Sequence, residues 1–326
     1  MKRFFAYLIP ILFLSILVSL SLLYYFKYDF EKNDLTISPI PEFLTISKNK
    51  QVRLLDLWSP IVSSSVGSGF NPESLSAKSA IVFDLTTNKT IFEKSATTKY
   101  PMASLTKIMT AVISLENKKY NNRYVVKKED LVGENSMGLA VGEILSLEEL
   151  LYGLMLPSGN DAAEVLANNF QTGRSGFIQA MNLKAKSLGL NNTHFDNPSG
   201  LQGDGEQFTT SYDLLVITRY ALENFPLFAK IVSTPEYHII ATRTHQPFDL
   251  YNETNLLTSY EGVKGVKTGY TPEAGLCLVT YIEFKGHKII GVILNSENRR
   301  SEMKNLLDYS FKTLGVAPPE YKGNLL

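Results

Sequence analysis

The segment that decides the fold runs from residue 100 to residue 111 and reads YPMASLTKIMTA. Apolar residues follow Ser104 at helical spacing, which predicts a helix over 104–115. Side chains three residues apart share a helix face, so the Lys107 amine can reach the Ser104 hydroxyl. A lysine in dry surroundings near other cations can lose its proton and activate a serine nucleophile. A capping serine beside a solvated lysine is the simpler interpretation of this motif alone.

A second polar motif, Ser158-Gly159-Asn160, stands between the predicted helices Leu147–Met155 and 161–170. A tight turn there would project a hydroxyl and an amide towards the first motif. Ser158 would then act in a proton relay and Asn160 would bind substrate. A plain helix N-cap explains the same residue types, so the motif is weak by itself.

The third motif, Lys267-Thr268-Gly269, lies in the segment GVKGVKTGYT at 262–271. A cation and a hydroxyl on a strand edge suit a substrate carboxylate, and glycine leaves room for a peptide to lie against the strand. The backbone N–H groups of Ser104 and Tyr270 would form an oxyanion hole. The alternative is a glycine-rich hairpin with a surface lysine.

Strand patterns stand at both ends of the region that follows residue 76. A hairpin is predicted over 80–85 and 90–93, and a second one over 275–284 and 287–295. Helical patterns fill the middle, including one over 177–188, and a closing helix is predicted over 301–314. The expected fold class is therefore α+β, with a sheet built from segments distant in sequence.

The N-terminus has the pattern of a membrane anchor. Residues 4–26 carry no charge, follow Lys2 and Arg3, and are long enough to span a bilayer. The apolar stretch exceeds that of an ordinary signal peptide and lacks a small-residue cleavage site, which favours an uncleaved transmembrane helix over a cleaved one. The positive-inside rule then places the rest of the chain outside the cytoplasm, on the periplasmic or cell-wall side. Residues 28–75 are interpreted as a linker.

Composition excludes several functional classes. The 32 basic and 32 acidic residues cancel, so nothing indicates a nucleic-acid partner. The four histidines show no metal-ligand spacing, and neither a metal nor a cofactor is expected. Cys277, the single cysteine, lies in an apolar run and is expected to be a buried thiol.

The order and spacing of the three motifs resemble those of the low-molecular-mass penicillin-binding proteins, the serine D-alanyl-D-alanine carboxypeptidases of the serine β-lactamase/D,D-peptidase superfamily. The resemblance also includes LPSGNDAA at 156–163, FDNPSGL at 195–201 and VKTGYT at 266–271. It extends over 76–316, the expected catalytic domain, between an anchor at 1–27 with its linker and a tail at 317–326. It implies an antiparallel sheet flanked by helices with a helical lobe.

The resemblance also implies roles for individual residues. Ser104 would be the nucleophile, Lys107 its base and Ser158 the relay. The expected substrate-binding residues are Asn160, Lys267, Thr268, Gly269 and Arg299. The adjacent Arg300 leaves the last assignment open. The loop at 196–201 is interpreted as structural.

The implied activity is removal of the terminal D-alanine from peptidoglycan stem peptides through an acyl-enzyme, with β-lactams as covalent inhibitors. A D,D-endopeptidase would use the same groups. A β-lactamase is less favoured, because no Glu-x-x-Leu-Asn pattern stands between Ser158 and Lys267. A wall-binding or β-lactam-sensing module without turnover is the non-enzymatic alternative.

Overall fold

The computed structural model describes residue 21 and residues 75–202, 205–254 and 256–323. The predicted membrane span at 4–26 lies outside these residues except for Ser21, and the linker at 28–75 lies outside them except for Leu75. No helix in the described part of the chain is both long and apolar enough to cross a membrane.

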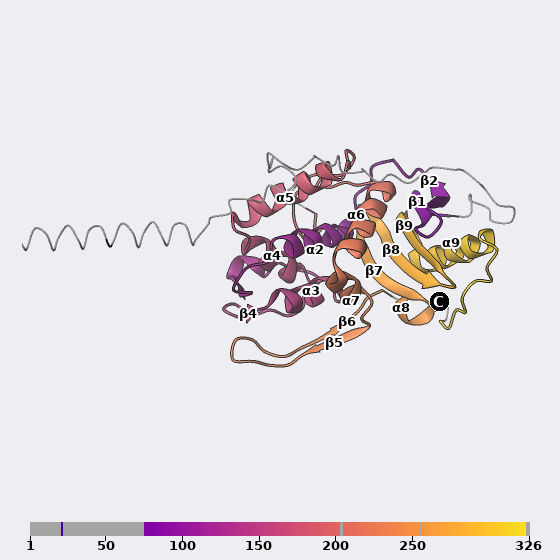
Figure 1. Cartoon of the computed structure of the whole chain (residues 1–326). Helices are drawn as coiled ribbons and strands as arrows, with labels where there is room; N and C mark the ends of the chain where they lie inside the picture. The colour runs from indigo at the N-terminus through magenta and orange to yellow at the C-terminus, as the bar shows by residue number, and fades with distance from the viewer. Residues whose placement is uncertain (1–20, 22–74, 203–204, 255, 324–326) are drawn as a thin grey trace, which may run out of the picture. The chain divides into compact units, whose positions relative to one another are not determined.

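Five antiparallel strands form the main sheet, in the order β2-β1-β9-β8-β7 (Figure 1). Their bounds are β1 Ser79–Asp84, β2 Lys89–Lys94, β7 Val263–Thr271, β8 Gly275–Phe284 and β9 His287–Ser296. The N-terminal hairpin pairs with β9 through β1, so the sheet joins segments about two hundred residues apart. The predicted α+β class and both predicted hairpins are confirmed.

The two faces of the sheet pack against different helices. In β1, Ile81 and Phe83 belong to the larger apolar cluster, whereas Ala80 and Val82 belong to a second cluster. Alternate strand residues point to opposite faces, which explains this division. Helix α9, Arg299–Thr313, packs on the second face, and the helical lobe packs on the first (Figure 1).

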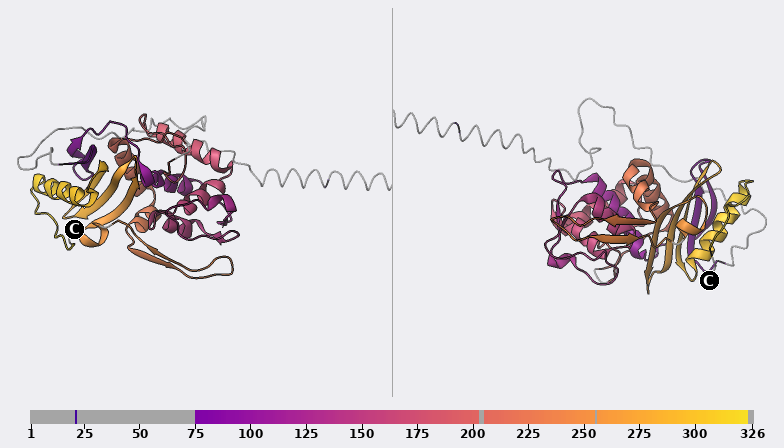
Figure 2. Two further views of the ribbon diagram at one scale, coloured as in Figure 1. Left: turned by 180° about the vertical axis from the view of Figure 1, so that it is seen from behind. Right: turned by 90° about the horizontal axis from the view of Figure 1, so that it is seen from below.

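The helical lobe surrounds α2, Thr106–Glu116, in which every residue before Glu116 is buried. Its neighbours are α3 Leu147–Met155, α4 Asn160–Asn168, α5 Gly173–Ser187 and α6 Ser211–Asn224. Figure 2 shows these helices gathered beside the sheet, with α2 among them. A helix buried all round carries apolar residues on every face and is fixed by tertiary packing.

Shorter elements complete the described fold. They are η3 Ala103–Leu105, β3 Tyr124–Val125, η4 Lys128–Asp130, β4 Ile144–Leu145, α7 Pro226–Val232, β5 Glu236–Ile239, β6 Phe248–Tyr251 and α8 Leu256–Ser259. Strands β5 and β6 pair with each other and not with the main sheet. The sequence patterns did not predict α6, α7, β5 or β6.

Candidate active site

Ser104 lies in a tight turn rather than in the α-helix itself. The prediction of an α-helix from residue 104 is wrong at its first turn, because Ala103–Leu105 form a 3-10 turn and α2 begins at Thr106. The preceding Ala103 has φ +47°, a region that residues with a Cβ rarely occupy. This strained backbone precedes the predicted nucleophile directly, and such strain is concentrated at functional sites.

Lys107 connects the first motif to two other parts of the fold. Its Nζ donates hydrogen bonds to Ser104 Oγ at 2.9 Å, to Asn160 Oδ1 at 2.7 Å and to the carbonyl of Ser199 at 2.7 Å. The residue is 0% exposed. Burial, and secondarily the nearby Lys267 cation, hold the pKa of Lys107 well below its ordinary value. A lowered pKa increases the neutral fraction of an amine, which is the form that accepts a proton from a serine hydroxyl.

The second motif forms the turn between α3 and α4, as predicted. Ser158 has φ +63°, and its buried Oγ makes no hydrogen bond within the described residues. Buried hydroxyls normally have a partner, so this one is available to a substrate or a transferred proton. Asn160 begins α4, and its side-chain oxygen accepts a hydrogen bond from the Lys107 amine. The Asp161 carboxylate holds the turn by accepting hydrogen bonds from the backbone N–H groups of Met137 and Leu139.

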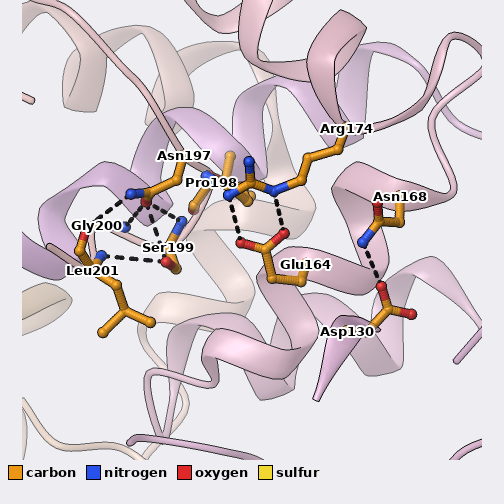
Figure 3. A network of polar contacts seen from close by, with 10 residues as sticks. Asp130, Glu164, Asn168, Arg174, Asn197, Pro198, Ser199, Gly200 and Leu201 are labelled. Atoms are coloured by element: carbon orange, nitrogen blue, oxygen red, sulfur yellow. Dashed lines mark hydrogen bonds and ion pairs between the residues drawn. The ribbon is translucent and has the colours of Figure 1, made fainter. Parts of the chain in front are cut away.

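The loop 197–201 holds the third acceptor of Lys107. Asn197 Oδ1 accepts the N–H groups of Ser199 and Gly200, and its Nδ2 donates to the carbonyl of Leu201 (Figure 3). Gly200 has φ +88°, and a Cβ built on it would lie 2.0 Å from the Ala103 oxygen. Only glycine permits this close approach, which fixes the loop directly against the turn of Ser104. The loop at 196–201 was interpreted from its sequence as structural, and the contribution of the Ser199 carbonyl was not predicted.

A cavity of about 310 Å³ borders this loop. Its lining includes Ser199, Leu201 and the ion pair between Glu164 and Arg174 (Figure 3). Glu164 lies on α4, one helical turn beyond Asn160. The ion pair therefore braces the helix that carries the amide contacted by Lys107.

The third motif lies on β7, the edge strand of the sheet, as predicted. Lys267 is buried, and its desolvation lowers its pKa to about 8. The negative charge of Glu253 opposes this shift, and the Arg299 cation adds to it. A Cβ built on Gly269 would lie 3.2 Å from the Ser104 nitrogen. Glycine thus lets the edge strand lie against the backbone of the nucleophile, where the N–H of Ser104 is expected to form half of the oxyanion hole. The Tyr270 side chain is exposed.

The two adjacent arginines have different surroundings. Arg299 Nη1 donates to the carbonyl of Gly269 at 2.7 Å, so its guanidinium braces the third motif. Arg300 instead stacks over the Tyr321 ring, 5.8 Å from its centroid. The geometry therefore favours Arg299 over Arg300 near the site, while its contact with a substrate carboxylate stays a prediction.

The described residues contain no group of three His, Cys, Asp or Glu side chains placed to hold a metal ion. Cys277 is buried as predicted, and burial raises the pKa of its thiol to about 11. Such a thiol is inert at neutral pH. The fold brings the Lys107 amine to the Ser104 hydroxyl, joins the second motif to that amine through Asn160 and places Gly269 of the third motif against the Ser104 backbone. This constellation defines the class of serine acyl-enzyme hydrolases that use a lysine base.

Comparison with known proteins identifies the family within this class. The family model described as D-alanyl-D-alanine carboxypeptidase matches residues 67–298. A Streptomyces D-alanyl-D-alanine carboxypeptidase is 37% identical over 245 residues, which cover 69% of this chain and 84% of that protein. The crystal structure of a Streptomyces DD-transpeptidase superposes with a TM-score of 0.70 at 34% identity and covers 75% of this chain and 100% of its own. The chain belongs to the D-alanyl-D-alanine carboxypeptidase family.

The match to other relatives is partial. D-alanyl-D-alanine carboxypeptidase DacF of Bacillus subtilis is 32% identical over 260 residues, and the chain spans 65% of its length. The predicted family and its fold, an antiparallel sheet with a helical lobe, are confirmed. The roles of the individual site residues stay predictions that rest on the geometry above.

Proposed function

We propose that this chain is a serine-type carboxypeptidase that removes the terminal D-alanine from peptidoglycan stem peptides ending in D-alanyl-D-alanine. The observation that carries the proposal is the 2.9 Å contact between the buried Lys107 amine and the Ser104 hydroxyl. The lowered pKa of Lys107 provides a base, and the Ser199 and Asn160 oxygens orient it. Membership of the carboxypeptidase family supports the same activity.

The reaction begins when the substrate lies along β7 with its terminal carboxylate near Lys267, Thr268 and Arg299. Lys107 accepts the Ser104 proton while the oxygen attacks the carbonyl carbon of the penultimate D-alanine. The backbone N–H groups of Ser104 and Tyr270 stabilise the resulting oxyanion. Lys107 passes this proton through Ser158 to the leaving amine, the peptide bond breaks, and an ester on Ser104 remains. Water then hydrolyses the ester and regenerates the hydroxyl. A β-lactam would acylate the same oxygen through its ring amide.

Release of D-alanine from a synthetic pentapeptide by the full-length chain in detergent tests this activity. The wild type should release one D-alanine per peptide, and Ser104→Ala should release none above background. Ser175→Ala is the matched control, because Ser175 is exposed on α5. Retention of substantial turnover by Ser104→Ala would exclude Ser104 as the nucleophile.

A D,D-endopeptidase activity is the second candidate. The D-alanyl-D-alanine endopeptidase of Escherichia coli is 32% identical over 229 residues, which cover 68% of this chain and 72% of that protein. Both reactions need the same nucleophile, base and oxyanion hole, so the site groups do not separate them. Incubation with equal concentrations of a pentapeptide and a cross-linked muropeptide dimer separates them by rate. A carboxypeptidase should hydrolyse the pentapeptide faster.

We also propose that residues 4–26 form a transmembrane helix that anchors the catalytic domain outside the cytoplasm. The charge-free stretch and the preceding Lys2 and Arg3 support this proposal. After expression in a bacterium, the chain should stay in the membrane fraction through alkaline carbonate washing and be digested by protease added to spheroplasts. A protein released by the wash, or an N-terminal sequence beginning after residue 26, would contradict an uncleaved anchor.

A further inference from the structure

Glu253 is an acidic residue beside the three motifs that the sequence analysis did not single out. It follows β6, and its backbone N–H donates to the carbonyl of Leu156, just before the second motif. Its Oε2 accepts from the Thr268 hydroxyl at 3.4 Å and its Oε1 from the Asn135 amide at 3.4 Å. One carboxylate thus bridges the loop of Asn135 and the edge strand.

The backbone of Glu253 is held while its side chain is exposed. The neighbouring Asn252 amide donates to the carbonyls of Val232 and Thr234, and its oxygen accepts the N–H of Thr254. Thr254 is buried. The Glu253 side chain is exposed, and both of its polar contacts are long. The residue is therefore fixed in place, but its carboxylate can be displaced at low cost.

Glu253 also lies within the field of the site's cations. Its charge acts to raise the pKa of Lys107, of Lys267 and of Arg299. Among the ion pairs of the described residues, none joins Glu253 to any of these cations within 4.0 Å. The carboxylate is close enough to shift the pKa values of these cations, but it forms no salt bridge with any of them.

We propose that Glu253 determines how strongly the enzyme discriminates between a carboxylate and a neutral group at the end of its substrate. The inference rests on the proposed function, in which Thr268 binds the substrate carboxylate. In the free enzyme the Glu253 carboxylate contacts that same hydroxyl. A substrate carboxylate must displace it and then tolerate a like charge nearby, whereas a terminal carboxamide meets no repulsion.

The size of the effect follows from the exposure of Glu253. Like charges several ångströms apart in partly solvated surroundings typically change affinity by about 3- to 10-fold. At a pH well below the Lys267 pKa of about 8, where this amine is charged with or without Glu253, removal of the charge should raise kcat/KM for a carboxylate substrate by about that factor and leave a carboxamide substrate nearly unchanged. A purely structural role for Glu253 would change both substrates equally.

The test compares Glu253→Gln in the full-length chain with the wild type, using a peptide ending in D-alanyl-D-alanine and the same peptide ending in D-alaninamide. Glu93→Gln is the matched control, since Glu93 is exposed on β2 at the opposite edge of the sheet. The ratio of kcat/KM values, carboxylate over carboxamide, should rise about 3- to 10-fold in Glu253→Gln and stay constant in Glu93→Gln.

An unchanged or lower ratio in Glu253→Gln would overturn the inference. Acylation rates with a penicillin and with its methyl ester provide the same ratio if the carboxamide peptide is hydrolysed too slowly to measure. Glu253→Ala serves in place of the glutamine variant if that variant does not fold. Failure of the proposed function is distinguishable, because the wild type would then release neither D-alanine from the carboxylate peptide nor D-alaninamide from the carboxamide peptide.

Discussion

Lys267 should set the alkaline limit of turnover. Its pKa is lowered to about 8, mainly by burial, from the ordinary value of a free lysine near 10.4. The ammonium that attracts the substrate carboxylate is therefore present below this pKa and is lost as pH rises through it. For one titrating group, the charged fraction falls about tenfold between about pH 7 and about pH 9. We expect kcat/KM for a carboxylate peptide to fall by the same factor.

Lys107 should set the acid limit, with the opposite sign. Its neutral form is the base, so activity should fall as pH decreases through its lowered pKa. The charge of Lys267 is one cause of the lowered pKa of Lys107, so the acid limb depends on both amines.

The assay is release of D-alanine from the carboxylate peptide, or of D-alaninamide from the carboxamide peptide, across about pH 5 to about pH 10 at constant ionic strength. Lys267→Arg is the diagnostic variant, because a guanidinium stays charged throughout this range. Whatever activity this variant keeps should lose the alkaline limb, and a terminal carboxamide peptide should lack that limb in the wild type. A wild-type profile that stays flat to the alkaline end, or an unchanged limb in Lys267→Arg, would refute the assignment of Lys267.

Three further substitutions test single contacts of the site. Lys107→Met should slow acylation by a labelled penicillin about 10²- to 10⁴-fold, the usual contribution of a general base, and an acylation rate within a factor of about three of the wild type would exclude that role. Gly269→Ala places a methyl group 3.2 Å from the Ser104 nitrogen and should lower the acylation rate by about tenfold or more without changing far-ultraviolet circular dichroism, so a wild-type rate would count against the oxyanion hole. Gly200 has φ +88°, and a Cβ there would lie 2.0 Å from the Ala103 oxygen. Gly200→Ala should therefore lower the free energy of unfolding, measured by urea denaturation, by about 2 kcal/mol or more. An unchanged stability would contradict the close approach.

Local patterns in the sequence predicted much of the fold. The bounds of Leu147–Met155 and Gly275–Phe284 agree with the structure at both ends. The first of these helices begins with a Ser146–Glu149 capping box, a signal encoded within four residues. Helix α5 was predicted to begin at residue 177 but begins at Gly173. Glycine has low helix propensity, so packing against the other helices of the lobe, rather than local preference, sets the first residue of α5.

The unpredicted helix α6 carried a readable signal. Thr210 caps it by accepting the N–H of Asp213, and apolar residues follow at helical spacing. Strands β5 and β6 are only four residues long and form an isolated pair, so their patterns are too short to separate from a loop.

The same distinction between local and distant contacts holds for the site. The contact between Ser104 and Lys107 spans three residues and follows from helix geometry alone. The Ser199 oxygen that completes the lysine's surroundings is 92 residues away and is a backbone carbonyl, which any residue type offers. Glu253 contacts Thr268 only because the fold places the segment after β6 beside β7. Such contacts depend on the tertiary fold and leave no short motif.

The nucleophile is identified by the intact mass of the full-length chain after incubation with benzylpenicillin, followed by peptide mapping of the adduct. Acylation opens the lactam ring without loss of atoms, so we expect a mass increase equal to one whole penicillin molecule. The adduct should map to Ser104 and be absent from Ser104→Ala. A chain that gains no mass, or one whose adduct maps to another residue, would contradict the central claim that the Ser104 hydroxyl, activated by Lys107, is the nucleophile.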